Sequence, residues 1–199
     1  MPWRDPELFL GVFAFMGLGF VLVGLAFPYL VLSLRDTRNE ERDPEIGLKS
    51  ALYFMFSLSI LLVLSGLTII VVDVLEDRST SIDFSDAQRN GFGMIVSGFA
   101  FGLFHLFVIL GFTNDRHFPA TRRVFVGGRL AVHGVVMLAA FTALVIQVFQ
   151  PTVEFRQLKP TFGILMVWGP SWIVHLVLLR MYRSASTRRR RFEEPRLDD

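Results

Sequence analysis

Residues 50–75 read SALYFMFSLSILLVLSGLTIIVVDVL, an apolar run of 26 residues in which Asp73 is the one charged side chain. A helix rises about 1.5 Å per residue, so roughly 20 apolar residues cross a hydrocarbon layer about 30 Å thick. Water is absent from that layer, so the backbone N–H and C=O groups must bond within the segment, as they do in a helix. This stretch therefore predicts a transmembrane helix.

Four further runs are long and apolar enough to span a membrane: Leu8–Leu34, Gly91–Thr113, Val124–Phe149 and Thr161–Tyr182. We predict an all-α integral membrane protein with a five-helix transmembrane domain over residues 1–183. The connections between spans are short, so neighbouring helices should pack antiparallel, with spans two to five as the core and span one beside them. The first run is too long for a signal-peptide core and its flank lacks a net positive charge, so we expect it to stay in the mature protein.

The composition supports a membrane protein and excludes several chemistries. Hydrophobic residues make up 52% of the 199 residues and charged residues only 19%, and the mean hydropathy is +0.50. The absence of cysteine excludes disulfides, thiolate-held clusters, Cys-ligated zinc and thiol redox chemistry. The net charge of +2 does not indicate nucleic-acid binding, because the basic residues follow the pattern of membrane topology.

Lys and Arg are distributed unequally between the two sides of the predicted five-helix path. One side holds fifteen of them and the other holds five. Basic residues gather on the cytoplasmic side of membrane proteins. We therefore predict that the N-terminus is outside and the C-terminus cytoplasmic, in the plasma or inner membrane of the cell.

The segment 184–199 contains the run Arg188-Arg189-Arg190-Arg191 and little apolar content, so it predicts a disordered basic cytoplasmic tail. Four arginines just past a span can attract anionic lipid headgroups. They can also act only as an anchor that fixes the topology.

An internal repeat is suggested by two pairs of segments. Residues 68–76 (TIIVVDVLE) align without gaps on residues 142–150 (TALVIQVFQ), and residues 92–106 (FGMIVSGFAFGLFHL) align on residues 162–176 (FGILMVWGPSWIVHL). Apolar composition also produces chance matches. A true duplication would make spans two and three and spans four and five parallel tandem repeats, with His105 equivalent to His175.

Three histidines, His105, His133 and His175, lie inside predicted spans, where ionisable residues are costly and a functional role is the default reading. Each lies roughly 10 to 14 Å in from the cytoplasmic helix end, at about 1.5 Å per residue. Arg129 lies four residues before His133 on the same helical face.

These residues suggest a haem b site. In an up-down arrangement, spans three and five are diagonal, so His105 and His175 could bind one haem iron from opposite sides as axial ligands, with His133 in support. Gly98 and Gly102 lie on the face of His105 and could leave room for a flat ring. Arg129 could pair with a propionate.

Other interpretations of the same residues remain open. Gly98 and Gly102 form a GxxxG pattern, which commonly means close helix packing, and span five has Trp168 and Trp172 at the matching positions. Histidines can hydrogen-bond between helices without a ligand. Three histidines could also bind zinc or copper. Asp73 lies at the opposite end of its span, so we interpret it as a capping or interface residue.

Three functional hypotheses follow. The first is a haem-binding electron-transfer subunit. The second is a non-enzymatic membrane or accessory subunit whose histidines and glycines only join helices, with a membrane-protein partner or a second copy beside it. The third is a small transporter or channel in which the histidines and Arg129 line a cytoplasmic vestibule for protons or an anion. Because the loops leave no room for a soluble catalytic domain, we expect no stand-alone catalysis and favour the second hypothesis.

Overall fold

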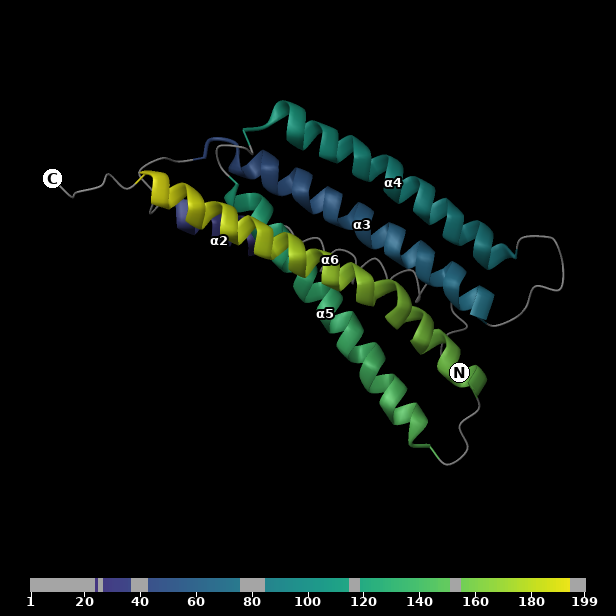
Figure 1. Cartoon of the computed structure of the whole chain (residues 1–199). Helices are drawn as coiled ribbons and strands as arrows, with labels where there is room; N and C mark the ends of the chain where they lie inside the picture. Colours follow the sequence, from purple (N-terminus) through teal and green to yellow (C-terminus); the bar gives the residue numbers. More distant parts are fainter. Residues whose placement is uncertain are drawn as a thin grey trace.

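The computed structural model describes residues 24, 27–36, 43–75, 85–114, 119–150 and 155–193. All regular structure in these residues is helical (Figure 1). The helices are α2 (Phe27–Asp36), α3 (Ile46–Leu75), α4 (Asp86–Phe112), α5 (Ala120–Val148) and α6 (Phe155–Glu193). The predicted all-α class is confirmed for this part of the chain.

Four of these helices are long and apolar enough to span a membrane. They are α3, α4, α5 and the Gln157–Tyr182 part of α6, with mean hydropathies of 2.6, 2.2, 2.1 and 1.8 over their most apolar windows. They coincide with predicted spans two to five. Most of the predicted first span, Leu8–Leu34, lies outside the described residues, and α2 covers the end of it.

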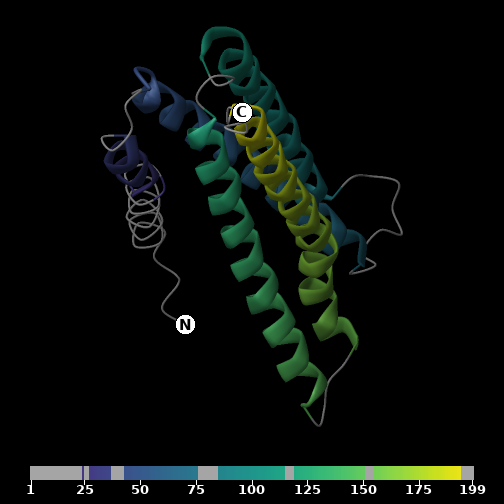
Figure 2. The ribbon, with the colours of Figure 1, turned by 60° about the vertical axis from the view of Figure 1, so that its left-hand side comes forward.

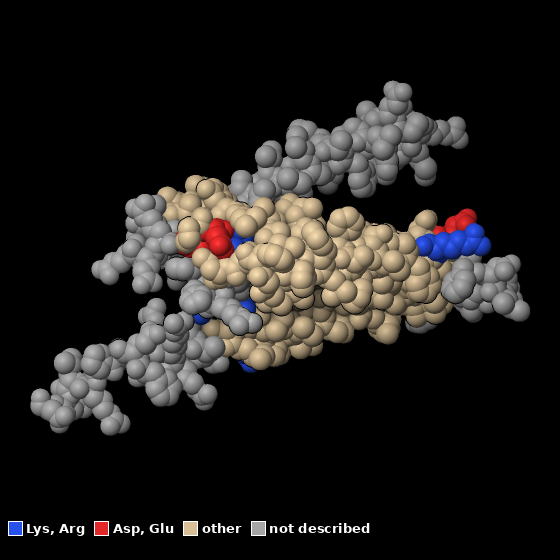
Figure 3. Space-filling model, turned by 90° about the horizontal axis from the view of Figure 1, so that it is seen from above, with Lys and Arg blue, Asp and Glu red and all other residues tan. Residues whose placement is uncertain are grey.

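The distribution of charge and burial is that of a protein surrounded by lipid. On the face in Figure 3, charged atoms among the described residues lie at the two ends and leave an uncharged belt between them. Large apolar side chains such as Phe107, Val135 and Leu138 are exposed, whereas Lys49, Arg129 and His133 are buried. Apolar groups outside and polar groups inside are what a bilayer requires. The chain is a membrane-embedded helical protein.

Helix α3 lies at the centre of the arrangement. It contacts α2, α4, α5 and α6, while α5 and α6 pack against each other along their length (Figure 1). Among the described helices α4 contacts α3 alone. In Figure 2, α2 lies beside α5 on the side away from α4. We expected spans three and five to lie diagonally across a bundle of four; instead, α3 separates α4 from the α5–α6 pair.

Small residues bring α3 and α4 into close contact. A Cβ added to Gly66 would lie 2.5 Å from the carbonyl oxygen of Gly91, and one added to Gly98 would lie 2.8 Å from the carbonyl oxygen of Ser59. The two backbones are therefore too close for side chains at these positions. This is the close packing that small residues allow between membrane helices.

Polar contacts mark both ends of the bundle, which we call the Lys49 end and the Asp73 end. At the Lys49 end, buried Lys49 forms an ion pair with Asp43, and Glu45 accepts a hydrogen bond from the backbone N–H of Asn114 over 2.8 Å. At the Asp73 end, Ser85 donates to Asp73 over 2.8 Å.

The interpretation of Asp73 as a capping or interface residue is consistent with its surroundings. Ser85 is the N-cap of α4 and also accepts a hydrogen bond from the backbone N–H of Gln88. Asp73 thus holds the residue that begins the next helix. At the same end, Thr161 donates to Gln147 over 3.1 Å and links α5 to α6 in a similar way. Asp73 and Gln147 occupy matching positions in the suggested repeat, which stays a prediction.

Helix α6 contains Pro160 and Pro170 and continues to Glu193. Its last ten residues belong to the basic segment 184–199. A helix that continues α6 gives this segment no apolar core of its own. The predicted disorder of residues 184–199 therefore stays a prediction, as does the division of the chain at residue 183.

Candidate functional site

A buried polar cluster joins α5 to α6 near the middle of the bundle. His133 on α5 is fully buried and His175 on α6 is 6% exposed; their ring centroids are 4.5 Å apart and the rings are nearly perpendicular. A hydrogen bond of 3.3 Å joins Oγ of Ser171 to Nδ1 of His133. His175 donates from Nδ1 to the carbonyl oxygen of Ser171 over 2.8 Å. One residue of α6 therefore contacts both histidines.

Trp168 extends the cluster to α3. Its ring meets His133 edge to face at a centroid distance of 5.3 Å, and its indole N–H donates to the hydroxyl of Thr68 over 3.0 Å. A buried indole N–H needs such a partner. Thr68 in turn donates to the carbonyl oxygen of Leu64 within α3. Three helices are thus tied together by contacts among residues that are mostly buried.

Arg129 lies one turn of α5 nearer the Lys49 end than His133 and is 7% exposed. Its guanidinium carbon is 5.1 Å from the centre of the Phe56 ring, a favourable cation–π arrangement. Its Nε and Nη1 atoms are buried and have no hydrogen-bond partner among the described residues. Arg129 therefore carries a buried charge that its protein contacts satisfy only in part.

The third histidine, His105, does not belong to this cluster. His105 on α4 is 8% exposed and donates from Nδ1 to the carbonyl oxygen of Phe101 over 2.7 Å, and the ring of Phe104 meets it edge to face. Because α4 contacts α3 alone among the described helices, the structure does not bring His105 to His175. The geometry that we expected for two axial ligands is absent from this part of the chain.

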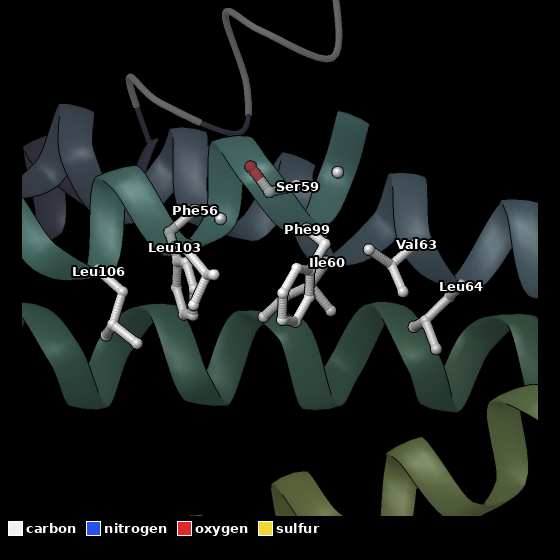
Figure 4. Close-up of a pocket in the computed structure, with 10 residues that line it drawn as sticks. Phe56, Ser59, Ile60, Val63, Leu64, Phe99, Leu103 and Leu106 are labelled. Atoms are coloured by element: carbon white, nitrogen blue, oxygen red, sulfur yellow. The ribbon is translucent and has the colours of Figure 1, made fainter. Parts of the chain in front are cut away.

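Helix α3 packs directly against Gly98 and Gly102, the glycines that were expected to make room for a flat ring. A Cβ on Gly98 would meet Ser59 and Val63 below 3.2 Å, and one on Gly102 would lie 3.4 Å from the Cβ of Ser59. Apolar side chains of α3 and α4 line a hollow of about 300 Å³ beside these glycines (Figure 4). Among the described residues that line it, Ser59 has the one polar side chain and none is an iron ligand.

Each histidine nevertheless has a ring nitrogen, Nε2, that is not used in a hydrogen bond among the described residues. Donation from Nδ1 leaves the lone pair of a neutral imidazole on Nε2 in His105 and His175, and a ligand histidine is held in the same way. In His133, Nε2 is buried without a hydrogen-bond partner among the described residues. No group of three metal-binding side chains occurs in the described part of the chain. The three histidines therefore do not form the zinc or copper site that their common depth suggested.

The role of Ser171 was not predicted from the sequence. Its signal was present, since Ser171 lies four residues before His175 and so on the same helical face. Trp168 entered the prediction only as the residue that matches a glycine of the other span, and Thr68 only as part of a repeat. The hydrogen bond between them depends on which helices are neighbours, which local spacing does not determine.

The chain matches no protein-family model, and comparisons with curated proteins and with solved structures also give no match.

Proposed function

We propose that the chain is a non-enzymatic membrane or accessory subunit of the plasma or inner membrane, in which the histidines and glycines of the spans join helices. The observation that carries this proposal is the set of contacts of the residues that first suggested a cofactor. His133 and His175 contact each other and Ser171, His133 also contacts Trp168, and Gly98 packs against α3. These contacts are those of a joint between membrane helices, which forms without any bound group.

As an accessory subunit, the chain would leave any catalytic step to a partner protein. The connections between described helices are too short for a separate catalytic domain, and a membrane-protein partner or a second copy would contact the apolar faces of the bundle. In the predicted orientation the N-terminus is outside and Arg188, Arg189, Arg190 and Arg191 face the anionic headgroups of the cytoplasmic leaflet. No nucleic acid is involved.

Haem b is the first alternative. With His105 and His175 as axial ligands, α4 would have to leave its contact with α3 and approach α6. His133 and His175 cannot hold a ring between them as they stand, because their own rings are in contact at 4.5 Å. Gly98, Gly102 and Arg129 belong to this alternative as the expected ring space and propionate partner.

A small transporter or channel is the second alternative, and the position of Arg129 favours it. A charge beside His133 whose donors are not all satisfied by the described residues could line a vestibule for protons or an anion. Flux into liposomes that contain the purified protein would measure this activity directly, with empty liposomes as the control.

An absorption spectrum of the detergent-purified protein, before and after dithionite, tests the proposal. Expression is carried out with ample haem, and metals are measured on the same sample. We expect no Soret band, no bound metal, and lower thermal stability when His133 or His175 is replaced by Leu. A Soret band at about one haem per chain that is lost in His105→Leu would refute the proposal.

The accessory role needs a second measurement. After mild solubilisation of native membranes, we expect the chain to migrate in an assembly larger than its own mass of 22.6 kDa. Loss of the gene should lower the amount of one specific membrane protein, and expression of the wild-type chain should restore it. A monomer whose loss changes no other membrane protein contradicts an accessory role.

A further inference from the structure

A second hollow of about 220 Å³ lies between α2, α3 and α5. Its walls are formed mainly by apolar side chains, including Pro28 from α2, Phe54 and Leu61 from α3, and Val132 from α5. Among the described residues that line it, Ser57 and Arg129 have polar side chains. Ser57 donates to the carbonyl oxygen of Tyr53 over 2.7 Å, so its hydroxyl already has a partner.

Arg129 is different, because its charge is not neutralised by the described residues around it. It is 93% buried, its Nε and Nη1 donors have no hydrogen-bond partner among those residues, and its guanidinium lies over the face of Phe56. A guanidinium stays charged in proteins, and a buried charge without a counter-ion is strongly unfavourable. Because Arg129 lines the hollow, an anionic group there would act as a counter-ion for its guanidinium.

The walls restrict what that anion can be. An apolar hollow with one charged group at its edge fits an amphiphile better than a hydrated ion. At about 220 Å³ it is smaller than the roughly 300–1,000 Å³ of ordinary ligand pockets, so it has room for a part of one chain and not for two. The planar guanidinium matches the geometry of a carboxylate.

The depth of Arg129 supports a compact headgroup. Arg129 lies seven residues after Arg122 on α5, which places it about 10 Å further from the Lys49 end at 1.5 Å per residue. Arg122 packs over the ring of Tyr182 at 4.5 Å near that end. A carboxylate on one chain can descend to the level of Arg129 more easily than a phosphate that two chains and a glycerol hold at the interface.

We propose that the hollow between α2, α3 and α5 binds a single-chain fatty acid, with its carboxylate on Arg129 and the first part of its chain against Pro28, Leu61 and Val132. This ligand site goes beyond the proposed accessory function and does not depend on it. The site is separate from the contact of His133 with His175, which remains intact when the fatty acid binds.

The test measures saturable binding of radiolabelled oleate to the purified full-length chain in detergent. Oleyl alcohol is the uncharged competitor of equal chain length, phosphatidylglycerol the two-chain anionic competitor, and inorganic phosphate the competitor without a chain. We expect about one oleate per chain, displaced by unlabelled oleate and at least tenfold less effectively by each of the other three.

Two variants locate the site, and one serves as a matched control. Arg129→Gln removes the charge, and Gly128→Leu places a side chain in the hollow, where a Cβ meets nothing within 4 Å. Both should weaken oleate binding at least tenfold. Gly127→Leu adds the same side chain at the neighbouring position, which is also open but does not line the hollow, and should bind as the wild type does.

Several outcomes would overturn the proposal. They are the absence of saturable oleate binding to the wild type, equal binding by Arg129→Gln, and equal displacement by oleyl alcohol. Stronger competition by phosphatidylglycerol or by phosphate would identify a phospholipid headgroup or a free anion as the occupant instead. If Gly128→Leu does not fold, oleate binding by Arg129→Gln alone tests the proposal. This variant should fold, because removing an unpaired buried charge should leave the thermal stability of the free protein equal to or above that of the wild type.

Discussion

Replacing Gly98 by Ala tests whether the contact between α3 and α4 holds the described bundle together. The added Cβ would lie 2.8 Å from the carbonyl oxygen of Ser59 and 2.9 Å from a methyl group of Val63. Favourable contacts between carbon atoms lie at roughly 3.5–4.0 Å, so α4 must move away by about 0.5–1 Å. Because α4 contacts no other described helix, this movement weakens its whole packing interface with the bundle.

The magnitude follows from two opposing effects. Overpacking a close contact costs about 1–3 kcal/mol. Alanine in place of glycine inside a helix returns about 1 kcal/mol through helix propensity. Gly93→Ala in the same helix is the matched control, since a Cβ there meets nothing within 4 Å. Because the propensity gain is shared, the two variants should differ by about 1–3 kcal/mol, the size of the overpacking effect alone.

The assay is unfolding of the purified protein in mixed micelles with increasing dodecyl sulfate, followed by circular dichroism. We expect Gly98→Ala to unfold at a lower dodecyl sulfate fraction than Gly93→Ala, with Gly93→Ala at or above the wild type. Equal midpoints for the two variants would show that α4 does not pack on α3 as described. A Gly98→Ala variant more stable than Gly93→Ala would refute the reasoning outright.

Three further changes test other parts of the structure. Thr68→Val removes the acceptor for the indole N–H of Trp168 and should destabilise the protein by about 1–3 kcal/mol in the same unfolding assay, with a smaller penalty once Trp168→Phe is added. Ser85→Ala removes the N-cap of α4 and should cost about 0.5–2 kcal/mol, while Ser85→Asn should recover most of it if capping is the cause. Because the chain contains no cysteine, Asn114→Cys and Gln150→Cys can each be labelled in cells with an impermeant maleimide; Gln150→Cys should react from outside and Asn114→Cys should not, and the reverse pattern would invert the predicted topology.

The sequence predicted the helices well because their cause is local. An apolar run such as residues 50–75 has to be helical in lipid whatever its neighbours are. The predicted span Ser50–Leu75 ends with α3 at Leu75, although α3 begins at Ile46. Helix α3 therefore has four more residues at its start, and among them Lys49 forms an ion pair with Asp43, a contact with no signature in hydropathy.

The arrangement of the helices could not be predicted in the same way. Short connections favour neighbours that are consecutive in sequence, and α3–α4 and α5–α6 do pair. The connection between α4 and α5 is equally short, yet these two helices do not pack. Close contact between α3 and α4 depends on Gly66 opposite Gly91 and Gly98 opposite Ser59, and the sequence does not show which small residues face each other.

His105 and His175 show how a local pattern can mislead about a site. They align in the suggested repeat, are similarly buried, and donate from Nδ1 to the carbonyl oxygen four residues before them. The rings that they contact differ, because α6 packs against α5 whereas α4 does not pack against α5. His175 therefore meets His133, whereas His105 meets only aromatic rings of its own helix among the ring contacts described.

Whether an intramembrane polar residue needs a ligand is decided by what remains unsatisfied once the helices are packed. For His175 and Trp168 the neighbouring side chains and carbonyl groups supply the partners, so burial itself explains their positions. Arg129 retains two buried donors without partners in the described part of the chain, beside a hollow that no described side chain fills. A residue of this kind is costly to keep unless something binds to it. His133 also leaves one buried nitrogen, Nε2, without a partner in that part of the chain, but a neutral imidazole needs no counter-ion. The physical case for a ligand is therefore stronger at Arg129 than at the histidines, and oleate binding to Arg129→Gln is the measurement that decides it.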